Sequence, residues 1–547
     1  MMSRFNPLLS RRDSFSLLAA DARPERSFLS AGILAIVSGI LWFIPWLAPA
    51  LFVTAWLAPV PLLMALQRAN ALRAFLLGWL AGSVCFAGAG YWMIDFAINL
   101  RGVSWPTSLA LASLFWIYAG LALGVGCLLA QFLRRAFPAW QFVTFPLALV
   151  VSMGVFPLLF ETRFAEAQTG FLLALQGVDL VGAQGLDFLM LMFAVLIFQC
   201  LSWRHDAGRW LRHPSLLGWG LLVVWFAYSG SSWLYWEREV AGWSTKRIGL
   251  VQPNDAPSIE VPPPPPGFSR ENPPEMQASQ RLVDAGAELI IWPEARYKGY
   301  FERYSVRQAY ARQVAEWGVP LVFHDAESQW VGGEQVGFNT VSLLDAQGHG
   351  GGHYRKMERM PFGEYLPAFF SMPGIDWLTQ RFLGEFLRPL AAGSHHGVFF
   401  LDDLLLVPKI CYETAFPASV AAAIGDDAAG KVLLFVSQDN WFGETSQPFQ
   451  HRDMSIVRGI ENRVPMIHVI NNGPSVVASP SGRVVASTRA FSQTEMVAEM
   501  PFSATAGGSF FSRNPLLFNT FINVLMMILL ALGIVRYVRR MRRNRKG

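Results

Sequence analysis

The amino-acid sequence predicts a polytopic α-helical membrane protein, in which a bundle of about eight transmembrane helices carries one α/β domain. Of its 547 residues 53% are hydrophobic and only 15% are charged, whereas soluble domains have about 25% charged residues. Seven apolar stretches of spanning length precede residue 240, and an eighth lies near the C-terminus. The long polar region between the last two alternates short β-type runs with amphipathic segments, which is typical of a layered α/β domain.

Each apolar stretch has about the 20 residues that a helix needs to cross a hydrocarbon core of roughly 30 Å. Aromatic side chains collect at membrane–water interfaces, and the 20 Trp and 42 Phe of the chain fit such a location. We predict membrane spans over residues 27–45, 48–66, 72–94, 107–132, 139–159, 184–203, 214–236 and 515–536.

The distribution of Lys and Arg predicts the orientation, because cytoplasmic loops are richer in basic residues than the loops on the other side. The segment 1–26 holds five arginines, and the loops around the ends of the second, fourth and sixth spans hold seven more. The alternate loops are poor in bases, and the C-terminal tail is again basic. We therefore expect both ends in the cytoplasm and the α/β domain on the periplasmic side of the cell inner membrane.

These patterns divide the chain into four predicted parts: a basic cytoplasmic leader over 1–26, a bundle of seven spans over 27–243, an α/β domain over 244–505, and an eighth span with a basic cytoplasmic tail over 506–547. Strands within the α/β domain are predicted over 247–252, 288–292, 320–324, 338–344, 397–401, 404–410, 432–437, 465–470 and 474–478. Helices are predicted over 273–286, 304–316, 415–424 and 450–463.

Three reactive side chains lie near the ends of these β-type runs: Glu294, Lys356 and Cys411. A helix after Cys411 would bring its positive end and backbone N–H groups near the thiol, and both favour the thiolate. A carboxylate can take the proton of a thiol, and a lysine can stabilise the negative oxygen of a tetrahedral intermediate. These are the residue types that acyl transfer through a thioester needs.

Six ordered motifs resemble those of a known family. They are Trp292-Pro293-Glu294-Ala295, Tyr354-Arg355-Lys356, Pro361-Phe362-Gly363-Glu364-Tyr365-Leu366-Pro367, Ile410-Cys411-Tyr412-Glu413, Ser437-Gln438-Asp439-Asn440-Trp441-Phe442-Gly443 and Asn471-Asn472-Gly473. With the predicted bundle, they make nearly the whole chain similar to the apolipoprotein N-acyltransferase family, a membrane-embedded part of the nitrilase superfamily. The resemblance implies a nitrilase-like αββα sandwich for the α/β domain.

The resemblance also implies the roles of individual residues. Glu294 would be the general base, Lys356 the cation that stabilises the oxyanion, and Cys411 the nucleophile. Supporting roles would fall to Glu364, Tyr412 and Glu413, with the backbone N–H of Tyr412 as a second oxyanion donor. The reaction of the family is ping-pong. A phospholipid acylates the cysteine, and the α-amine of a lipoprotein's N-terminal diacylglyceryl-cysteine then takes the acyl chain as an amide.

Apolar side chains are predicted to contact the lipid substrates. The segment 365–383 is unusually apolar for a loop and includes Phe369 and Phe370, which we expect at the surface of the outer leaflet. Trp441 and Phe442 are expected to join them around the pocket.

Other patterns favour no further chemistry. The histidines and cysteines lack the spacing of metal ligands, so we expect no metal and no other cofactor. The net charge of +5 comes mainly from helix ends and the tail, which argues against a nucleic-acid partner. Tyr91 and Trp92, at the outer end of the third span, fit an interfacial aromatic belt better than a substrate port. We expect the protein to act as a monomer in the lipid bilayer.

Three alternative functions share some of these features. A membrane-anchored carbon–nitrogen hydrolase (an amidase or nitrilase) would use the same triad but would leave the eight spans and the apolar loop unexplained. A paralogue with a different acyl acceptor is suggested by two departures from the family pattern, at 252–257 and 438–440. A catalytically idle scaffold would be expected to have lost triad residues, and this chain keeps all three.

Overall fold

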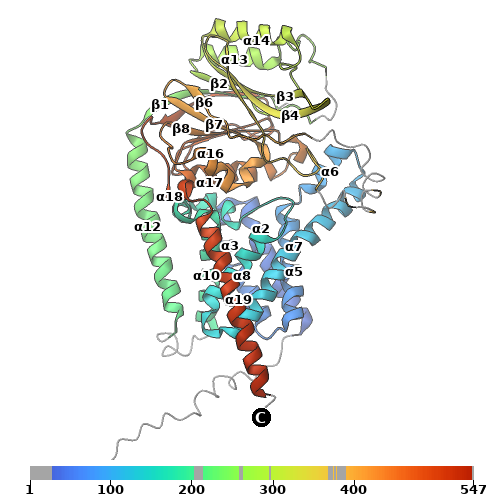
Figure 1. Cartoon of the computed structure of the whole chain (residues 1–547), viewed down its shortest axis with the longest axis vertical. Coiled ribbons are helices and arrows are strands. Elements are labelled where there is room, and N and C mark those ends of the chain that lie inside the picture. Colours follow the sequence, from blue (N-terminus) through green and yellow to red (C-terminus); the bar gives the residue numbers. More distant parts are fainter. Residues whose placement is uncertain are drawn as a thin grey trace, which may run out of the picture.

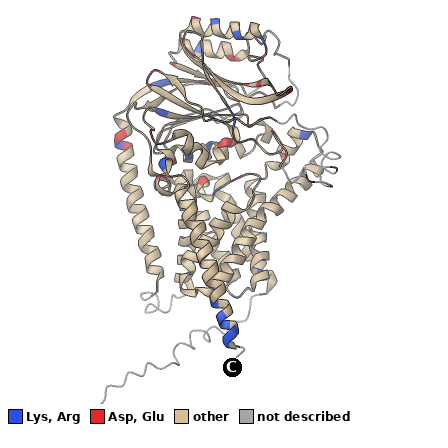
Figure 2. Ribbon diagram, in the orientation of Figure 1, with Lys and Arg blue, Asp and Glu red and all other residues tan. Residues whose placement is uncertain are grey.

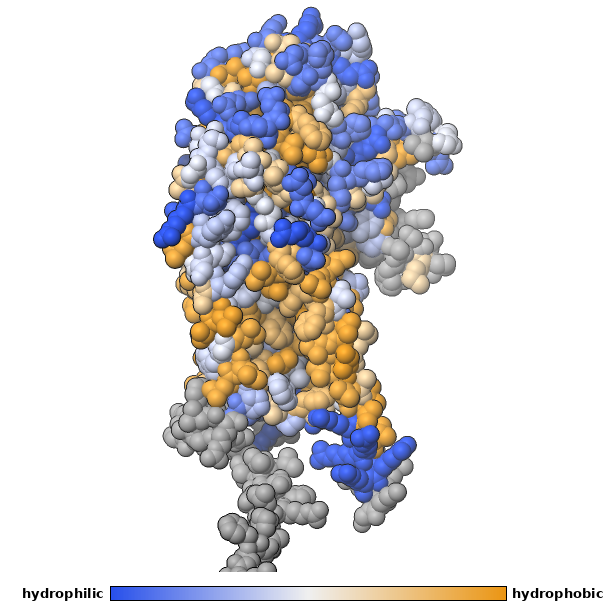
Figure 3. Space-filling model, turned by 60° about the vertical axis from the view of Figure 1, so that its left-hand side comes forward, coloured by the Kyte–Doolittle hydropathy of each residue, from blue (hydrophilic) through white to orange (hydrophobic). Residues whose placement is uncertain are grey.

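The computed structural model describes residues 27–202, 213–257, 263–294, 297–367, 372, 374, 377 and 390–544. A helical bundle forms one half of the molecule, and an α/β domain sits on one end of it (Figure 1). The surface of the bundle is mostly hydrophobic in the view of Figure 3, and that of the α/β domain is mostly hydrophilic. The predicted basic leader 1–26 lies outside the described residues.

Within the described part of the chain, seven helical segments are long and apolar enough to cross a membrane: α2 (Phe28–Leu47), η1 to α4 (Pro49–Leu66), α5 (Ala71–Ala89), α7 (Trp105–Ala136), η2 and α8 (Pro138–Val155), α10 (Val178–Ser202) and α19, which runs over Leu517–Asn544. The predicted span 214–236 forms α12 (Ser215–Ala241), a helix of 27 residues that runs beside the bundle (Figure 1). It is not among the seven, since its Trp, Tyr, Ser and Gly residues make it less apolar. The multi-pass membrane bundle is thus confirmed, with α12 as the least apolar of its eight long helices.

The predicted third span was too long. Helix α5 begins after Asn70, whose side chain accepts from the backbone N–H of Arg73, and it ends at Ala89. The chain turns at Gly90 and continues as the separate helix α6 (Met93–Arg101), which ends at Gly102 with a φ of +61°. Shorter connecting helices, η3 (Phe164–Phe171) and α9 (Leu172–Leu175), join α8 to α10 on the side of the α/β domain (Figure 1).

Helices α5 and α7 pack closely through glycines. A Cβ at Gly82 would lie 2.8 Å from the carbonyl oxygen of Gly120, and a Cβ at Gly120 would lie 2.9 Å from the carbonyl oxygen of Trp79. Small residues permit such an approach, and in a membrane this van der Waals packing drives helix association. The close pair sets the positions of Phe86 on α5 and Phe115 on α7, which both line a central cavity.

The α/β domain consists of two six-stranded sheets, ordered β12-β1-β2-β3-β4-β5 and β11-β10-β9-β8-β7-β6. The first sheet comprises β1 (Ser244–Gln252), β2 (Leu289–Ile291), β3 (Leu321–Val331), β4 (Glu334–Leu344), β5 (Gly350–Arg355) and β12 (Thr494–Phe502). The second comprises β6 (Phe399–Leu401), β7 (Leu404–Ile410), β8 (Lys431–Ser437), β9 (Met466–Ile470), β10 (Val476–Ala478) and β11 (Val484–Ser487). One apolar core joins the two sheets and includes Ile248, Ile291, Ile410 and Val436.

Helices cover the outer face of each sheet, so the domain is an αββα sandwich as predicted. Helices α13 (Pro274–Asp284) and α14 (Tyr304–Trp317) lie over the first sheet, farthest from the bundle (Figure 1). Helices α16 (Pro417–Ile424), α17 (Gln447–Asn462) and α18 (Phe510–Arg513) lie between the second sheet and the bundle (Figure 1). All nine predicted strands and all four predicted helices are present, whereas β5, β11 and β12 were not predicted.

A buried arginine at the end of α17 joins the α/β domain to the bundle. The side chain of Arg463 is 1% exposed, and its Nε lies 2.8 Å from Oδ2 of Asp179 on α10. The guanidinium also donates to the side chain and the backbone carbonyl of Gln176, at 2.8 and 2.6 Å, and to Oγ of Ser232 on α12, at 2.8 Å. One cation therefore ties three segments of the bundle to the domain that rests on it.

Charged residues are sparse along the bundle, apart from the basic end of α19 (Figure 2). This end, with Arg536, Arg539, Arg540, Arg542 and Arg543, leaves the bundle on the side opposite the α/β domain (Figure 2). The side of the membrane on which the α/β domain lies is therefore the side away from this basic tail.

Replacement of the buried arginine should loosen the two halves. Arg463→Ala leaves the carboxylate of Asp179 buried without its cation, and removal of one partner of a buried ion pair costs roughly 3–5 kcal/mol. We expect the apparent melting temperature of the detergent-solubilised protein to fall by several degrees.

The matched control is Arg483→Ala, since Arg483 also links the α/β domain to α12, through Glu237, but is 60% exposed. Exposed pairs contribute about 0–1 kcal/mol, so this variant should melt close to the parent protein. Equal losses in the two variants would contradict the assignment.

Candidate active site

Cys411 lies at the junction of a strand and a tight turn. It follows β7 directly and opens the 3₁₀ segment η5 (Cys411–Ala415), with a φ of +49°. Non-glycine residues rarely adopt this left-handed region, and such strain costs of order 1–3 kcal/mol and is found at functional sites. The α-helix predicted over 415–424 follows as α16 and begins at Pro417, two residues later than expected, because the 3₁₀ segment comes first.

The thiol of Cys411 is buried, with 6% of the residue exposed. Burial, and after it the charge of Glu294, raises the pKa of Cys411 well above its usual value, and the charge of Lys356 opposes the shift only in part. The groups that the sequence suggested would favour the thiolate do not outweigh burial, and the thiol keeps its proton at neutral pH. A nucleophile in this state needs a general base beside it.

Lys356 provides the positive charge near this thiol. It follows Arg355 at the end of β5, is 2% exposed, and donates from Nζ to Oε1 of Glu364 at 2.9 Å. Burial opposes its charge, but Glu364, Cys411 and Glu294 together raise the pKa of Lys356 above its usual value. These neighbours favour the charged form of the lysine, which is the form that can stabilise an oxyanion.

Glu294 lies three residues beyond the end of β2 and is held in place at both carboxylate oxygens. Oε1 accepts from Nδ2 of Asn339 at 2.7 Å, and Oε2 accepts from the backbone N–H of Gln438 at 3.1 Å. The same Nδ2 of Asn339 donates to Glu364 at 2.8 Å. A continuous chain of hydrogen bonds therefore runs from Lys356 through Glu364 and Asn339 to Glu294.

Glu294, Lys356 and Cys411, which are far apart in the sequence, thus come together at one place. The charges of Glu294 and Lys356 act directly on the Cys411 thiol. Asn339 was not predicted, because no local signal marks it: it is an amide within the buried half of β4. On its other side, Asn339 hydrogen-bonds to the ring of His324.

Glu413 connects the loop of the nucleophile to the loop of the lysine. One carboxylate oxygen accepts from the backbone N–H of Ile410 at 2.7 Å, directly before Cys411. The other accepts from the hydroxyl of Tyr354 at 2.6 Å and from the backbone N–H of Met357 at 3.1 Å, on either side of Lys356. The carboxylate is fully buried and so positions both reactive groups at once.

The side chain of Tyr412, in η5, extends from the α/β domain to the bundle. Its hydroxyl donates to the carbonyl of Leu159 at 2.9 Å, beyond the end of α8. Its ring packs edge-on against Phe160, with ring centroids 5.8 Å apart. The residue after the nucleophile is therefore anchored in the connection between two membrane segments.

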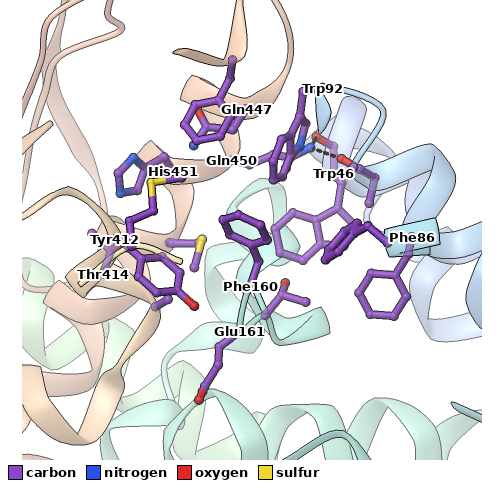
Figure 4. A pocket seen from close by; sticks show the side chains of 18 of the residues that line it. Trp46, Phe86, Trp92, Phe160, Glu161, Tyr412, Thr414, Gln447, Gln450 and His451 are labelled. Carbon is purple, nitrogen blue, oxygen red and sulfur yellow. Dashed lines mark hydrogen bonds between the residues drawn. The ribbon is translucent and has the colours of Figure 1, made fainter. Parts of the chain in front are cut away.

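An apolar cavity lies between Cys411 and the bundle, with about 910 Å³ of empty space, including the part open to solvent. The lining of the cavity includes Trp46, Cys85, Phe86, Ala89, Trp92, Phe115, Phe160, Met360, Cys411, Tyr412, Phe442, Gln450 and His451. Figure 4 shows Tyr412, Thr414 and His451 on one side of it and Trp46, Phe86 and Trp92 on the other. Glu294 and Lys356 are not among the lining residues, so of the three only Cys411 faces the cavity.

The predicted substrate-binding residues fare differently. Phe442 lines the cavity and stacks on Phe96 of α6, with ring centroids 5.1 Å apart. Trp441 packs against the same aromatic cluster but does not line the cavity. Phe369 and Phe370 lie outside the described residues.

Trp92, which the sequence placed in an interfacial belt, instead lines the cavity. Its Nε1 donates to Oε1 of Gln450 on α17 at 3.0 Å (Figure 4). The interpretation as a belt is wrong for this residue because the α/β domain covers the outer end of the helix.

We predict that Glu413→Gln slows any reaction of this site by about 10²-fold, the cost of misplacing reactive groups by roughly 1 Å. An amide has one acceptor oxygen and one donor nitrogen, so it cannot accept at both loops. The measurement is the rate of acylation of Cys411 by a phospholipid, followed by intact-mass spectrometry. Glu499→Gln, at an exposed position of β12, is the control and should react at the parent rate.

Comparisons with known proteins agree with this architecture. Residues 38–196 match the family model of the apolipoprotein N-acyltransferase N-terminal domain, and residues 274–507 match that of the carbon-nitrogen hydrolases. The apolipoprotein N-acyltransferase of Geobacter metallireducens is 28% identical, over 90% of this chain and 92% of that protein. The protein of the same name from Gloeobacter violaceus is 27% identical, over 79% of this chain and 80% of that protein.

Among solved structures, an amidase from Nesterenkonia sp. aligns with 51% of this chain and 97% of its own, with 19% identity and a TM-score of 0.36. The two matched domains follow one another in the order found here, with the membrane part first. Relatives of one name align along most of the chain. The chain belongs to the apolipoprotein N-acyltransferase family, a membrane-embedded part of the nitrilase superfamily.

Proposed function

We propose that this enzyme is a phospholipid-dependent N-acyltransferase that works through a thioester on Cys411. Its acceptor is the α-amine of the N-terminal diacylglyceryl-cysteine of apolipoproteins. The observation that carries the proposal is the position of the thiol: Cys411 faces an apolar cavity that is lined by membrane helices. Such a cavity can receive a fatty acyl chain without taking it through water.

The first half-reaction acylates the enzyme. Glu294 takes the proton of the Cys411 thiol, and the sulfur attacks the ester carbonyl carbon of the phospholipid. The negative oxygen that forms is stabilised by Nζ of Lys356 and by the backbone N–H of Tyr412. The C–S bond is complete when the C–O bond to the glycerol breaks, and Glu294 returns the proton to the departing alkoxide. The products are the thioester and a lysophospholipid.

The second half-reaction transfers the acyl chain. The acceptor amine attacks the thioester carbonyl and passes through the same oxyanion site, so that a C–N bond forms and the C–S bond breaks. The amine proton moves to Glu294 and then to the thiolate of Cys411, which restores the starting thiol. Each half-reaction uses Glu294 once as a base and once as an acid.

The apolar cavity favours acyl transfer over hydrolysis. An acyl-enzyme must be kept from water until the amine arrives, and exclusion of water is a property of closed apolar sites. Exposing a lipid chain to water costs about 0.8 kcal/mol for each CH₂, so a site reached from the bilayer avoids a large penalty. An amidase acting on small polar compounds would have no need of aromatic walls that extend into a membrane bundle.

We also propose that the α/β domain lies on the periplasmic side of the inner membrane. The basic residues of α19 leave the bundle at the opposite end, and basic segments remain in the cytoplasm. The proposed acceptor is the N-terminus of an exported lipoprotein precursor, and an exported N-terminus lies on this same side of the membrane. The acceptor and the phospholipid then reach the cavity from the same leaflet.

Two substitutions separate the steps of the mechanism. Incubation of the parent protein with phospholipid vesicles should add the mass of one acyl chain at Cys411, and a diacylated lipopeptide should then remove it. Cys411→Ala should form no adduct. Glu294→Gln should acylate at least 10²-fold more slowly, since the buried thiol has lost its base.

Other results would favour the rival functions. A long-chain adduct that water removes as fast as the lipopeptide does would indicate a hydrolase. A Cys411→Ala protein that supports lipoprotein maturation in cells would indicate a scaffold. Normal acylation by Glu294→Gln would remove Glu294 from its proposed role.

The depth of the cavity should limit the length of the acyl chain that the enzyme accepts. Ala89, at the end of α5, lines the cavity, and Ala89→Phe should shorten it. We expect the rate with a donor of sixteen-carbon chains to fall about tenfold or more, while the rate with an eight-carbon donor changes little. Ala87→Phe, on the same helix but not among the lining residues, is the control. An equal loss with both donors would contradict the assignment of the cavity.

A further inference from the structure

A buried histidine and aspartate lie directly behind Cys411, and the steps above do not use them. His451 lies in the second turn of α17, and Asp439 lies in the loop between β8 and η6 (Asn440–Phe442). Their side chains are 5% and 0% exposed. Figure 4 shows the ring of His451 on the same side of the cavity as Tyr412.

Both ring nitrogens of His451 contact an acceptor. Nδ1 lies 2.8 and 3.0 Å from the two carboxylate oxygens of Asp439, and Nε2 lies 2.9 Å from the carbonyl oxygen of Cys411. A carbonyl oxygen has no proton to give, so Nε2 carries one and donates it. A carboxylate likewise only accepts, so Nδ1 donates as well. The geometry therefore calls for an imidazolium paired with a carboxylate.

The electrostatics agree with this protonation. Burial opposes a charge on His451, but the carboxylate of Asp439 more than compensates and raises the pKa of His451 above its usual value. Glu294 acts in the same direction. His468 packs edge-on against His451, with ring centroids 4.7 Å apart, and burial lowers its own pKa well below the usual value, so that it stays neutral.

The hydrogen bond to Cys411 fixes a peptide group that the reaction uses. The carbonyl of Cys411 and the N–H of Tyr412 belong to one planar trans peptide, in which they point in opposite directions. A donor that holds the carbonyl therefore aims the N–H. A second donor to this carbonyl, Oγ1 of Thr414, is 3.4 Å away and gives a weaker hold.

The pair also controls the charge beside the thiol. After burial, the carboxylates of Glu294 and Asp439 raise the pKa of Cys411. An imidazolium on Asp439 cancels one of these two charges. Loss of that proton would leave a bare buried carboxylate next to a sulfur that must become negative.

We propose that His451, kept protonated by Asp439, is a positioning residue for both acyl-transfer steps: it aims the N–H of Tyr412 at the oxyanion and screens the thiolate of Cys411 from Asp439. The inference rests on the proposed function for the first part and on the geometry of the thiol alone for the second. The experiment can therefore treat the two parts separately.

Two variants of His451 each keep a different one of its two hydrogen bonds. The amide nitrogen of Gln can take the place of Nε2 and keep the bond to Cys411, whereas that of Asn can take only the place of Nδ1. We expect acylation by phospholipid vesicles to slow about tenfold in His451→Gln and about 10²-fold in His451→Asn, the cost of losing one oxyanion donor. The lipid concentration for half-maximal rate should stay within twofold.

A purely structural role would not separate the variants. Rates of His451→Asn within threefold of those of His451→Gln would overturn the positioning role, and so would a change confined to the half-maximal lipid concentration. Melting temperatures measured on the same samples identify losses that come from unfolding.

The pH dependence tests the charge. The raised pKa means that His451 is protonated at low pH and loses its proton above the usual range of histidine, so the parent rate should fall on the alkaline side. His451→Gln has no such proton and should lack this limb. If both His451 variants fail to fold, Asp439→Asn serves instead: it removes the charge that raises the pKa, so the limb should move to lower pH. A limb that stays unchanged in the variant tested would overturn the proposal.

Alkylation of Cys411 by iodoacetamide separates this inference from the proposed function, because alkylation needs a thiolate but neither lipid nor oxyanion donor. At pH 7 we expect it to be severalfold slower in His451→Gln than in the parent protein, and to recover when Asp439→Asn is added. Equal rates in the parent and His451→Gln would overturn the screening role. A parent protein that is alkylated normally but never acylated by phospholipid would refute the proposed function and leave the screening of the thiol standing.

Discussion

The burial of one thiol at the boundary between an apolar bundle and a polar domain governs the rest of this site. A sulfur in that position holds its proton, because burial and the nearby carboxylates both disfavour the thiolate. Two neighbouring groups act on this thiol: Glu294 is a carboxylate that can take a proton, and Lys356 supplies a positive charge. Asn339 spaces the carboxylates by bridging them through one amide nitrogen. The result is a thiol that keeps its proton at rest, beside a carboxylate and a lysine.

The backbone at Cys411 is strained, and neighbouring side chains hold it in that strained conformation. Cys411 has a left-handed backbone conformation that an isolated peptide would avoid. Glu413 accepts a hydrogen bond from the backbone of the preceding residue, and His451 donates one to the carbonyl of Cys411. The hydroxyl of Tyr412 hydrogen-bonds to the bundle beyond α8. Two of these contacts come from within the α/β domain and one from the membrane part, so both halves of the molecule support the conformation. Separation of the α/β domain from the bundle would release at least one of them.

Helix α17 contributes both to the joint between the two halves and to the lining of the cavity, and the sequence alone would not link these two roles. Its last turn and the following Arg463 join the domain to the bundle through buried charges, and its second turn places His451 and Gln450 at the cavity. Gln450 in turn holds Trp92 of the bundle. One helix thus carries both a joint to the bundle and part of the lining of the cavity.

Hydropathy and strand patterns in the sequence were enough to predict a multi-pass membrane bundle followed by a layered α/β domain, because spanning length and burial act on each segment separately, while the αββα arrangement was expected only from the family resemblance. They missed β5, whose three glycines lack packing side chains, and β12, whose partner strand lies at the other end of the domain. The sequence indicated groups that favour the thiolate, but burial, which depends on the whole fold, is the larger effect and raises the pKa of Cys411. Asn339, Asp439 and His451 carry no local signal for their roles. Only the tertiary structure brings them to Cys411 and encloses the cavity, because hydrogen bonds and cavity walls depend on residues that meet from distant parts of the chain.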